Sequence, residues 1–180
     1  MKNNLYKIFK LGQPRYLINK KELKTNYIKL LNIIHPNKWV FHSEKKYKLS
    51  EKITSELNEG YKILNNDIMR GQYILLLKSE NKNILNENLK YIYSTDIEVN
   101  NILKELHFID ESIKLYIQCN NLFELRKLLI MCSYNIEVIE KKYDEILLKN
   151  DSMYIARFYL LILERCKNQI ELINFNLIFN

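Results

Sequence analysis

Residues 20–39 read KKELKTNYIKLLNIIHPNKW, an amphipathic stretch that ends in a proline turn. Its apolar side chains recur at the spacing of one helix face, at Leu23, Tyr27, Leu30, Leu31 and Ile34. Asn19 is placed to cap this helix, and His35-Pro36 ends it because the residue before a proline is pushed out of the helical region. The stretch therefore predicts a helix with one buried face, followed by a rigid turn.

A second helical stripe follows Ser43 and predicts an antiparallel hairpin with the first helix. Its apolar positions are Leu49, Ile53, Leu57, Tyr61 and Leu64. Gly60 lies beside this stripe, where a small residue lets a neighbouring backbone approach closely. A short helix over 5–11 precedes the hairpin, and another over 68–77 follows it. The polar, turn-like stretch that comes next predicts a linker over 79–94.

The remainder of the chain reads as three helices. The first follows a cap at Thr95 or Asp96, the second covers 122–148, and the third starts after the polar break at 150–152. Short connections favour antiparallel neighbours, so residues 95–180 predict a three-helix bundle. The 180 residues include only 3 Gly and 2 Pro, too few turn formers for a β-sandwich. The predicted fold class is all-α.

The formal net charge of +7 is unevenly distributed. Residues 1–78 contain 16 basic and 6 acidic side chains, whereas residues 79–180 contain 12 basic and 15 acidic ones. Clustered lysines are the footprint of nucleic-acid binding, yet no helix face groups base-reading side chains. A basic helical nucleic-acid-binding protein is therefore the alternative interpretation of this chain.

The sequence contains no pattern typical of catalysis or metal binding. No acid, base or nucleophile accompanies His35 at a useful spacing, and Cys119, Cys132 and Cys166 lack histidines at ligand spacing. No apolar run reaches the roughly 18 residues of a membrane span. We therefore expect no enzyme, no metal, no cofactor and no membrane contact, and we expect neither a signal peptide nor a transit segment.

The order of residues resembles the HscB family, the J-domain co-chaperones of iron–sulfur cluster biogenesis. The resemblance is carried by Leu5-Tyr6-x-Ile8-Phe9-x-Leu11, His35-Pro36-Asn37-Lys38-Trp39, Leu57-Asn58-x-Gly60-Tyr61-x-x-Leu64 and Arg70-Gly71-x-Tyr73-Ile74-Leu75. It covers residues 5–78, and the length of the chain supports it beyond. It implies a J-domain over 1–78, whose helical hairpin carries the His-Pro-Asn loop, and a scaffold-binding three-helix bundle over 95–180.

The resemblance also implies two partners and two sets of contact residues. The J-domain would stimulate the ATPase of a DnaK-type chaperone, and the bundle would bind an IscU-type iron–sulfur scaffold. The implied chaperone contacts are His35, Pro36, Asn37 and Lys38 of the loop, with Lys20, Lys21, Lys24 and Lys29 of the preceding helix. The implied scaffold contacts are Ile102, Leu103, Leu106 and Asp110, completed by Tyr154 or Phe158. By periodicity alone, the three apolar positions among them fit a core as well as a docking strip.

Asn37 departs from the His-Pro-Asp signature of the family. The change keeps the shape and an amide oxygen but removes the charge, and charge-assisted hydrogen bonds are about twice as strong as neutral ones. The loss at an interface would be about 1–3 kcal/mol. The change leaves open three possibilities: a partner that compensates for the missing charge, a weakened stimulator, or a chain that binds the scaffold without stimulating the ATPase.

We expect the chain to be a monomer or weak dimer that binds no nucleic acid.

The residue pair Arg70-Gly71 resembles the sequence of the mitochondrial branch of the family more closely than that of bacterial members. It predicts the mitochondrial matrix or a relict mitochondrion (mitosome), with the bacterial cytoplasm as the alternative.

Overall fold

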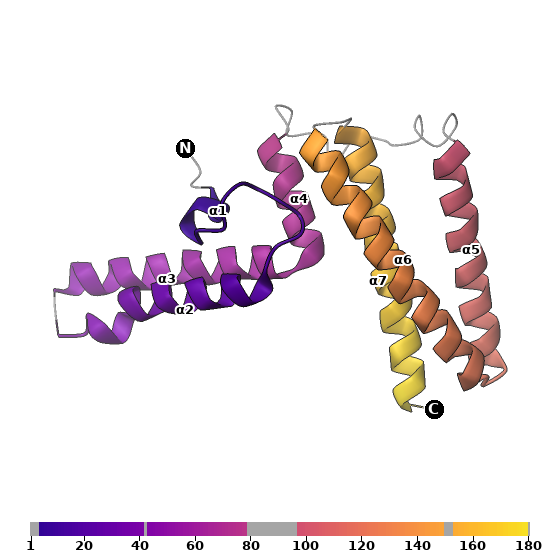
Figure 1. Cartoon of the computed structure of the whole chain (residues 1–180). Helices are drawn as coiled ribbons and strands as arrows, with labels where there is room; N and C mark the ends of the chain where they lie inside the picture. Colours follow the sequence, from indigo (N-terminus) through magenta and orange to yellow (C-terminus); the bar gives the residue numbers. More distant parts are fainter. Residues whose placement is uncertain (1–3, 42, 79–96, 150–152, 180) are drawn as a thin grey trace. The chain divides into compact units, whose positions relative to one another are not determined.

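The computed structural model describes residues 4–41, 43–78, 97–149 and 153–179, all of whose regular elements are helical (Figure 1). The elements are α1 (Leu5–Ile8), α2 (Lys20–Ile34), the 3₁₀ turn η1 (Pro36–Lys38), α3 (Glu44–Asn65), α4 (Asp67–Lys78), α5 (Ile97–Gln118), α6 (Leu122–Lys149) and α7 (Met153–Phe179). The all-α prediction is confirmed. The chain divides into two compact units, Met1–Ile74 and Leu75–Asn180. The predicted linker and the caps at Thr95 or Asp96 lie outside the described residues.

In the first unit, α2 and α3 lie side by side as an antiparallel hairpin (Figure 1). Asn19 caps α2 by accepting hydrogen bonds at Oδ1 from the backbone N–H groups of Lys21 and Glu22. The rings of Tyr27 and Tyr61 stack between the helices with centroids 4.3 Å apart. Leu23 is fully buried, so the helix face predicted from residues 20–39 is the one that packs.

Gly60 gives α1 its place against α3. A Cβ at this position would lie 2.8 Å from Leu5 Cδ2 and 3.2 Å from Phe9 Cε2, closer than ordinary van der Waals contact. The missing side chain therefore admits two apolar side chains of the N-terminal helix and its end. The sequence predicted a close neighbour at this glycine, and the structure shows that side chains rather than backbone approach it.

Arg70 connects α4 to the rest of the first unit from a buried position. Its guanidinium donates from Nε to the carbonyl oxygen of Tyr16 at 2.7 Å and from Nη1 to that of Leu64 at 2.7 Å. A third bond runs from Nη2 to Asp67 Oδ1 at 2.6 Å. Because Arg70 is only 3% exposed, these bonds replace water around its charge.

The second unit contains the three helices predicted for residues 95–180. One core cluster joins all three helices: Ile109, Ile113, Leu125, Leu128, Cys132 and Ile173. The tight connection between α5 and α6 depends on Asn120, which adopts a positive φ of 50°. Asn121 then caps α6 by accepting a hydrogen bond from the Glu124 N–H at 3.2 Å. This short connection forces α5 and α6 to run antiparallel.

Candidate functional site

The His35 turn is held together by its own backbone and by the imidazole. The N–H of His35 donates to the Leu31 carbonyl at 2.9 Å, which ends α2. His35 Nδ1 accepts from the N–H of Asn37 at 3.3 Å, while the N–H of Lys38 donates to the His35 carbonyl at 3.0 Å. His35 and Pro36 are half-buried, and Asn37 and Lys38 are exposed. The turn therefore presents the side chains of its third and fourth residues to solvent.

The predicted cationic face of α2 is exposed along its length. Lys21, Lys24 and Lys29 are exposed and make no ion pair among the described residues. Lys20 differs, because its Nζ forms an ion pair with Asp67 Oδ1 at 2.8 Å. The same oxygen also pairs with Nη2 of Arg70. Lys20 thus contributes to the internal anchor of α4, which leaves three lysines of this helix uncommitted.

The predicted scaffold-binding residues divide into surface and interior positions. Ile102 and Leu103 are half-buried, and Tyr154 is 44% exposed. Leu106 and Phe158 are only 3% and 1% exposed, so the structure places both inside the bundle, and their role as scaffold contacts stays a prediction. The reason is geometric: Leu106 lies on the face of α5 that packs against α7, where the Gln169 side chain reaches its carbonyl oxygen.

The partly exposed side chain of Asp110 also contacts α7. Its carboxylate accepts hydrogen bonds from Arg165 and, at 2.5 Å, from Gln169 Nε2. Partial burial raises the pKa of Asp110, but the bonds from Arg165 and Gln169 outweigh it, and the resulting pKa is lower than usual. Asp110 therefore joins α5 to α7, and its role as a docking carboxylate stays a prediction.

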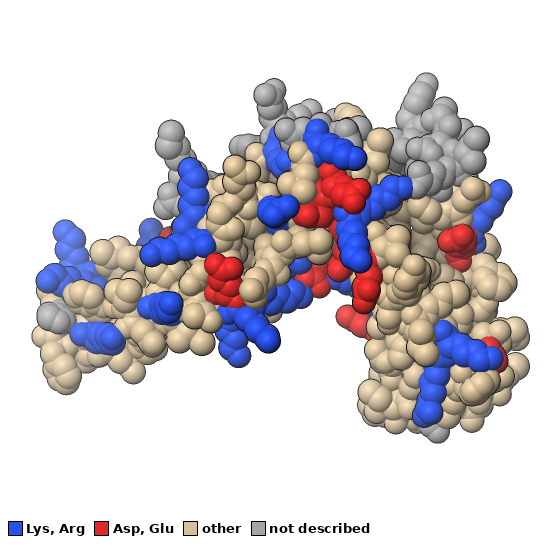
Figure 2. Space-filling view, viewed as in Figure 1, with Lys and Arg blue, Asp and Glu red and all other residues tan. Residues whose placement is uncertain are grey.

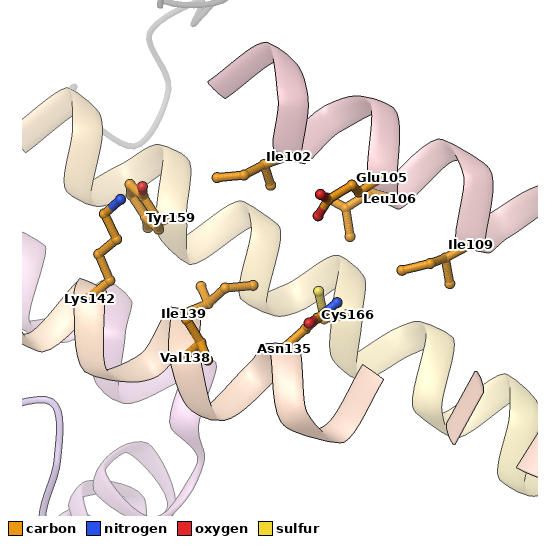
Figure 3. Close-up of a pocket in the computed structure, with 10 residues that line it drawn as sticks. All are labelled: Ile102, Glu105, Leu106, Ile109, Asn135, Val138, Ile139, Lys142, Tyr159 and Cys166. Atoms are coloured by element: carbon orange, nitrogen blue, oxygen red, sulfur yellow. The ribbon is translucent and has the colours of Figure 1, made fainter. Parts of the chain in front are cut away.

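A groove of about 220 Å³ opens between the three helices of the bundle (Figure 3). In Figure 3, Ile102, Leu106 and Ile109 point from α5 toward the other two helices. The remaining lining residues are Glu105, Asn135, Val138, Ile139, Lys142, Tyr159 and Cys166. Burial raises the pKa of the Cys166 thiol to about 12, so this cysteine is an unreactive part of the wall at neutral pH. The groove suits an apolar side chain with polar groups at its rim.

Both the sequence and the helical fold of this chain are similar to those of known proteins. The co-chaperone protein HscB of Buchnera aphidicola is 30% identical over 141 residues, covering 75% of this chain and 77% of the relative. The chain belongs to the HscB co-chaperone family. Two solved HscB structures share its fold: that of Vibrio cholerae, with a TM-score of 0.74, 16% identity and 95% of each chain covered, and the human one, with a TM-score of 0.75, 17% identity and 97% of this chain and 82% of the other covered. No protein-family model matches the chain.

Among the described residues, no three His, Cys, Asp or Glu side chains converge in a way that would hold a metal ion. The helices of the described part also include none long and apolar enough to cross a membrane.

The sequence missed the residues that α6 contributes to the groove, namely Asn135, Val138, Ile139 and Lys142. Their apolar members follow the same helical spacing as the core of α6. Only the pairing of α6 with α5 distinguishes groove from core, so no signal in the sequence was available to find them.

Proposed function

We propose that this HscB-family chain is a non-enzymatic adaptor between a DnaK-type chaperone and an IscU-type scaffold for iron–sulfur clusters. The J-domain would stimulate the chaperone's ATPase, and the bundle would hold the scaffold. The observation that carries the proposal is the self-contained His35 turn, which stands between a lysine-lined α2 and α3 in a chain of this family. A rigid loop between two packed helices is well suited to recognition.

On the chaperone side, the contacts are the His35 turn and the exposed lysines of α2. Asn37 carries an exposed side chain, and it stands where the family signature has Asp. A neutral amide offers a partner's arginine an ordinary hydrogen bond instead of a charge-assisted one. Stimulation by this chain therefore depends on how its own chaperone compensates for the missing charge.

On the scaffold side, the contacts are Ile102 and Leu103 at the half-buried edge of α5, with Tyr154 of α7. Glu105 and Lys142 at the groove supply polar groups around an apolar centre, the usual composition of a protein interface. The groove explains how Leu106 contributes without being exposed, because it forms part of the wall against which an anchor side chain would rest.

The decisive experiment measures ATP hydrolysis by the DnaK-type chaperone of the same organism, with the wild-type chain and with Asn37→Asp. We expect the wild-type chain to stimulate hydrolysis, and equal stimulation by both proteins would mean that the missing carboxylate is compensated. Asn32→Asp is the matched control, because it adds the same charge to an exposed position of α2. A wild-type chain that neither stimulates the chaperone nor captures the scaffold would overturn the proposal.

Nucleic-acid binding is separated from this function by a salt titration, because phosphate contacts make log affinity fall linearly with log salt concentration. Saturable binding to DNA or RNA at physiological salt, without scaffold capture, would favour the alternative.

The proposed compartment is the mitochondrial matrix or a mitosome, and the residue pair Arg70-Gly71 is its only support. The bacterial cytoplasm is the alternative. Imaging of a C-terminally tagged chain against an organelle marker tests it.

A further inference from the structure

Exposed apolar side chains stand at the tip of the α2–α3 hairpin, on both sides of the His35 turn. Phe41 is 99% exposed and Val40 53% exposed in the stretch between η1 and α3, and Ile33 is 64% exposed in the last turn of α2. Single exposed apolar residues are normal on protein surfaces, but three within nine positions at one end of a hairpin indicate an interaction site.

The surroundings of this tip are strongly cationic. Residues 29–52 contain six lysines and two glutamates, and one of the glutamates, Glu44, already pairs with Lys48 at 2.6 Å. Lys29, Lys38 and Lys45 are exposed and form no ion pair within the part of the chain that the structure describes. Lysine side chains are spread around this end of the hairpin in Figure 2. A complementary partner surface is therefore acidic around an apolar hollow.

The base of the tip is rigid. The N–H of Trp39 donates to the Pro36 carbonyl at 2.8 Å, which closes the 3₁₀ turn immediately before Val40. On the other side, Ser43 caps α3 by accepting the Lys46 N–H at 3.4 Å. Phe41 lies between these two fixed points, two residues after Trp39 and two residues before Ser43. A preorganised anchor loses little conformational freedom when it binds.

We propose that Phe41, flanked by Val40 and Ile33, is an apolar anchor that enters a hollow on an acidic surface of the DnaK-type ATPase. This inference rests on the proposed function, because it places the anchor next to the contact made by the His35 turn. The lysines and the anchor have separate tasks. Long-range charge sets how fast the partners meet, whereas desolvated apolar contacts set how long the complex lasts.

The test uses the full-length chain with Phe41→Ser and the purified DnaK-type ATPase of the same organism, without scaffold. We expect affinity to fall about ten-fold or more, as for a central anchor, with the loss in the dissociation rate. Phe41→Trp is expected to keep most of the affinity. Phe108→Ser is the matched control, because Phe108 is 68% exposed on α5 and has no part in the proposed contact.

Each outcome has a distinct meaning. Chaperone binding and stimulation by Phe41→Ser at wild-type levels would remove the anchor and leave the proposed function intact. A wild-type chain that fails to bind the chaperone at all would overturn both. Vesicles of phosphatidylserine and phosphatidylcholine provide the remaining arm. Wild-type vesicle binding that Phe41→Ser abolishes, with chaperone binding unchanged, would assign the tip to a lipid surface instead.

Discussion

The guanidinium of Arg70 lies 4.9 Å from the centre of the Tyr16 ring and donates from Nε to the carbonyl oxygen of the same residue. One side chain of α4 thus fixes both the backbone and the ring of a residue in the connection before α2. Since Tyr16 is itself fully buried, this pair holds the connection from α1 to α2 against the start of α4.

Arg70→Met is expected to destabilise the first unit by about 3–5 kcal/mol. The substitution removes a buried charge together with its three hydrogen bonds, to the carbonyls of Tyr16 and Leu64 and to the Asp67 carboxylate. Chemical denaturation followed by circular dichroism measures the change. Arg126→Met is the control, because Arg126 is exposed on α6. Equal stability of the two variants would show that Arg70 contributes no more than a surface arginine.

Two substitutions of Gly60 distinguish the steric effect of a side chain at this position from its effect on helix propensity. Gly60→Ala gains about 1 kcal/mol of helix propensity, which offsets the shift that its Cβ forces on the Leu5 and Phe9 side chains. Gly60→Leu is expected to cost about 1–3 kcal/mol by overpacking and to displace α1. Thermal melts of both variants test this. A Gly60→Leu protein as stable as the wild type would mean that the close packing of α1 against α3 does not contribute to stability.

The contrast between these helices shows what periodicity predicts. Asn19, the stripe from Leu23 onward and the break at His35-Pro36 are local signals, and each is realised where it was expected. The bundle surface is different, because Leu106 has the same spacing in a core stripe and in a docking strip. The α5–α7 contact decides between them. Asp110 likewise looks like a surface acid until Arg165, 55 positions later, is brought beside it.

Leu106→Ala is expected to affect mainly the stability of the bundle, and Leu103→Ala mainly scaffold binding. Leu106 is 3% exposed, so its truncation should destabilise the bundle by about 2–5 kcal/mol. Leu103 is half-buried at the edge of the proposed scaffold surface, so its truncation should weaken scaffold binding with a smaller effect on stability. A thermal melt and a binding isotherm on each variant distinguish the roles. Normal scaffold affinity in Leu103→Ala would remove this residue from the proposed surface.

Asp110 predicts a pH dependence of bundle stability. Its pKa in the folded chain lies below the ordinary value of 3.8. Stability from this group is therefore fully present above the unfolded pKa, and it is lost as pH falls through the folded value. The melting temperature of the wild-type chain should exceed that of Asp110→Asn at about pH 6, and the difference should shrink toward about pH 2. A constant difference across this range would mean that the carboxylate charge does not contribute.

Lys24 on the exposed face of α2 tests the charge of the proposed chaperone contact. Reversal of a charge at the edge of an interface mainly changes the association rate, because it alters the field that orients the partners before contact. Lys24→Glu is therefore expected to slow association with the DnaK-type ATPase several-fold and to reduce the dependence of that rate on salt, while dissociation changes little. Stopped-flow or biosensor kinetics at two salt concentrations measure both effects. Lys141→Glu, at a position of α6 that is also exposed, controls for the change in net charge. If the two reversals slow association equally, net charge alone steers the encounter and the α2 face is only solvated.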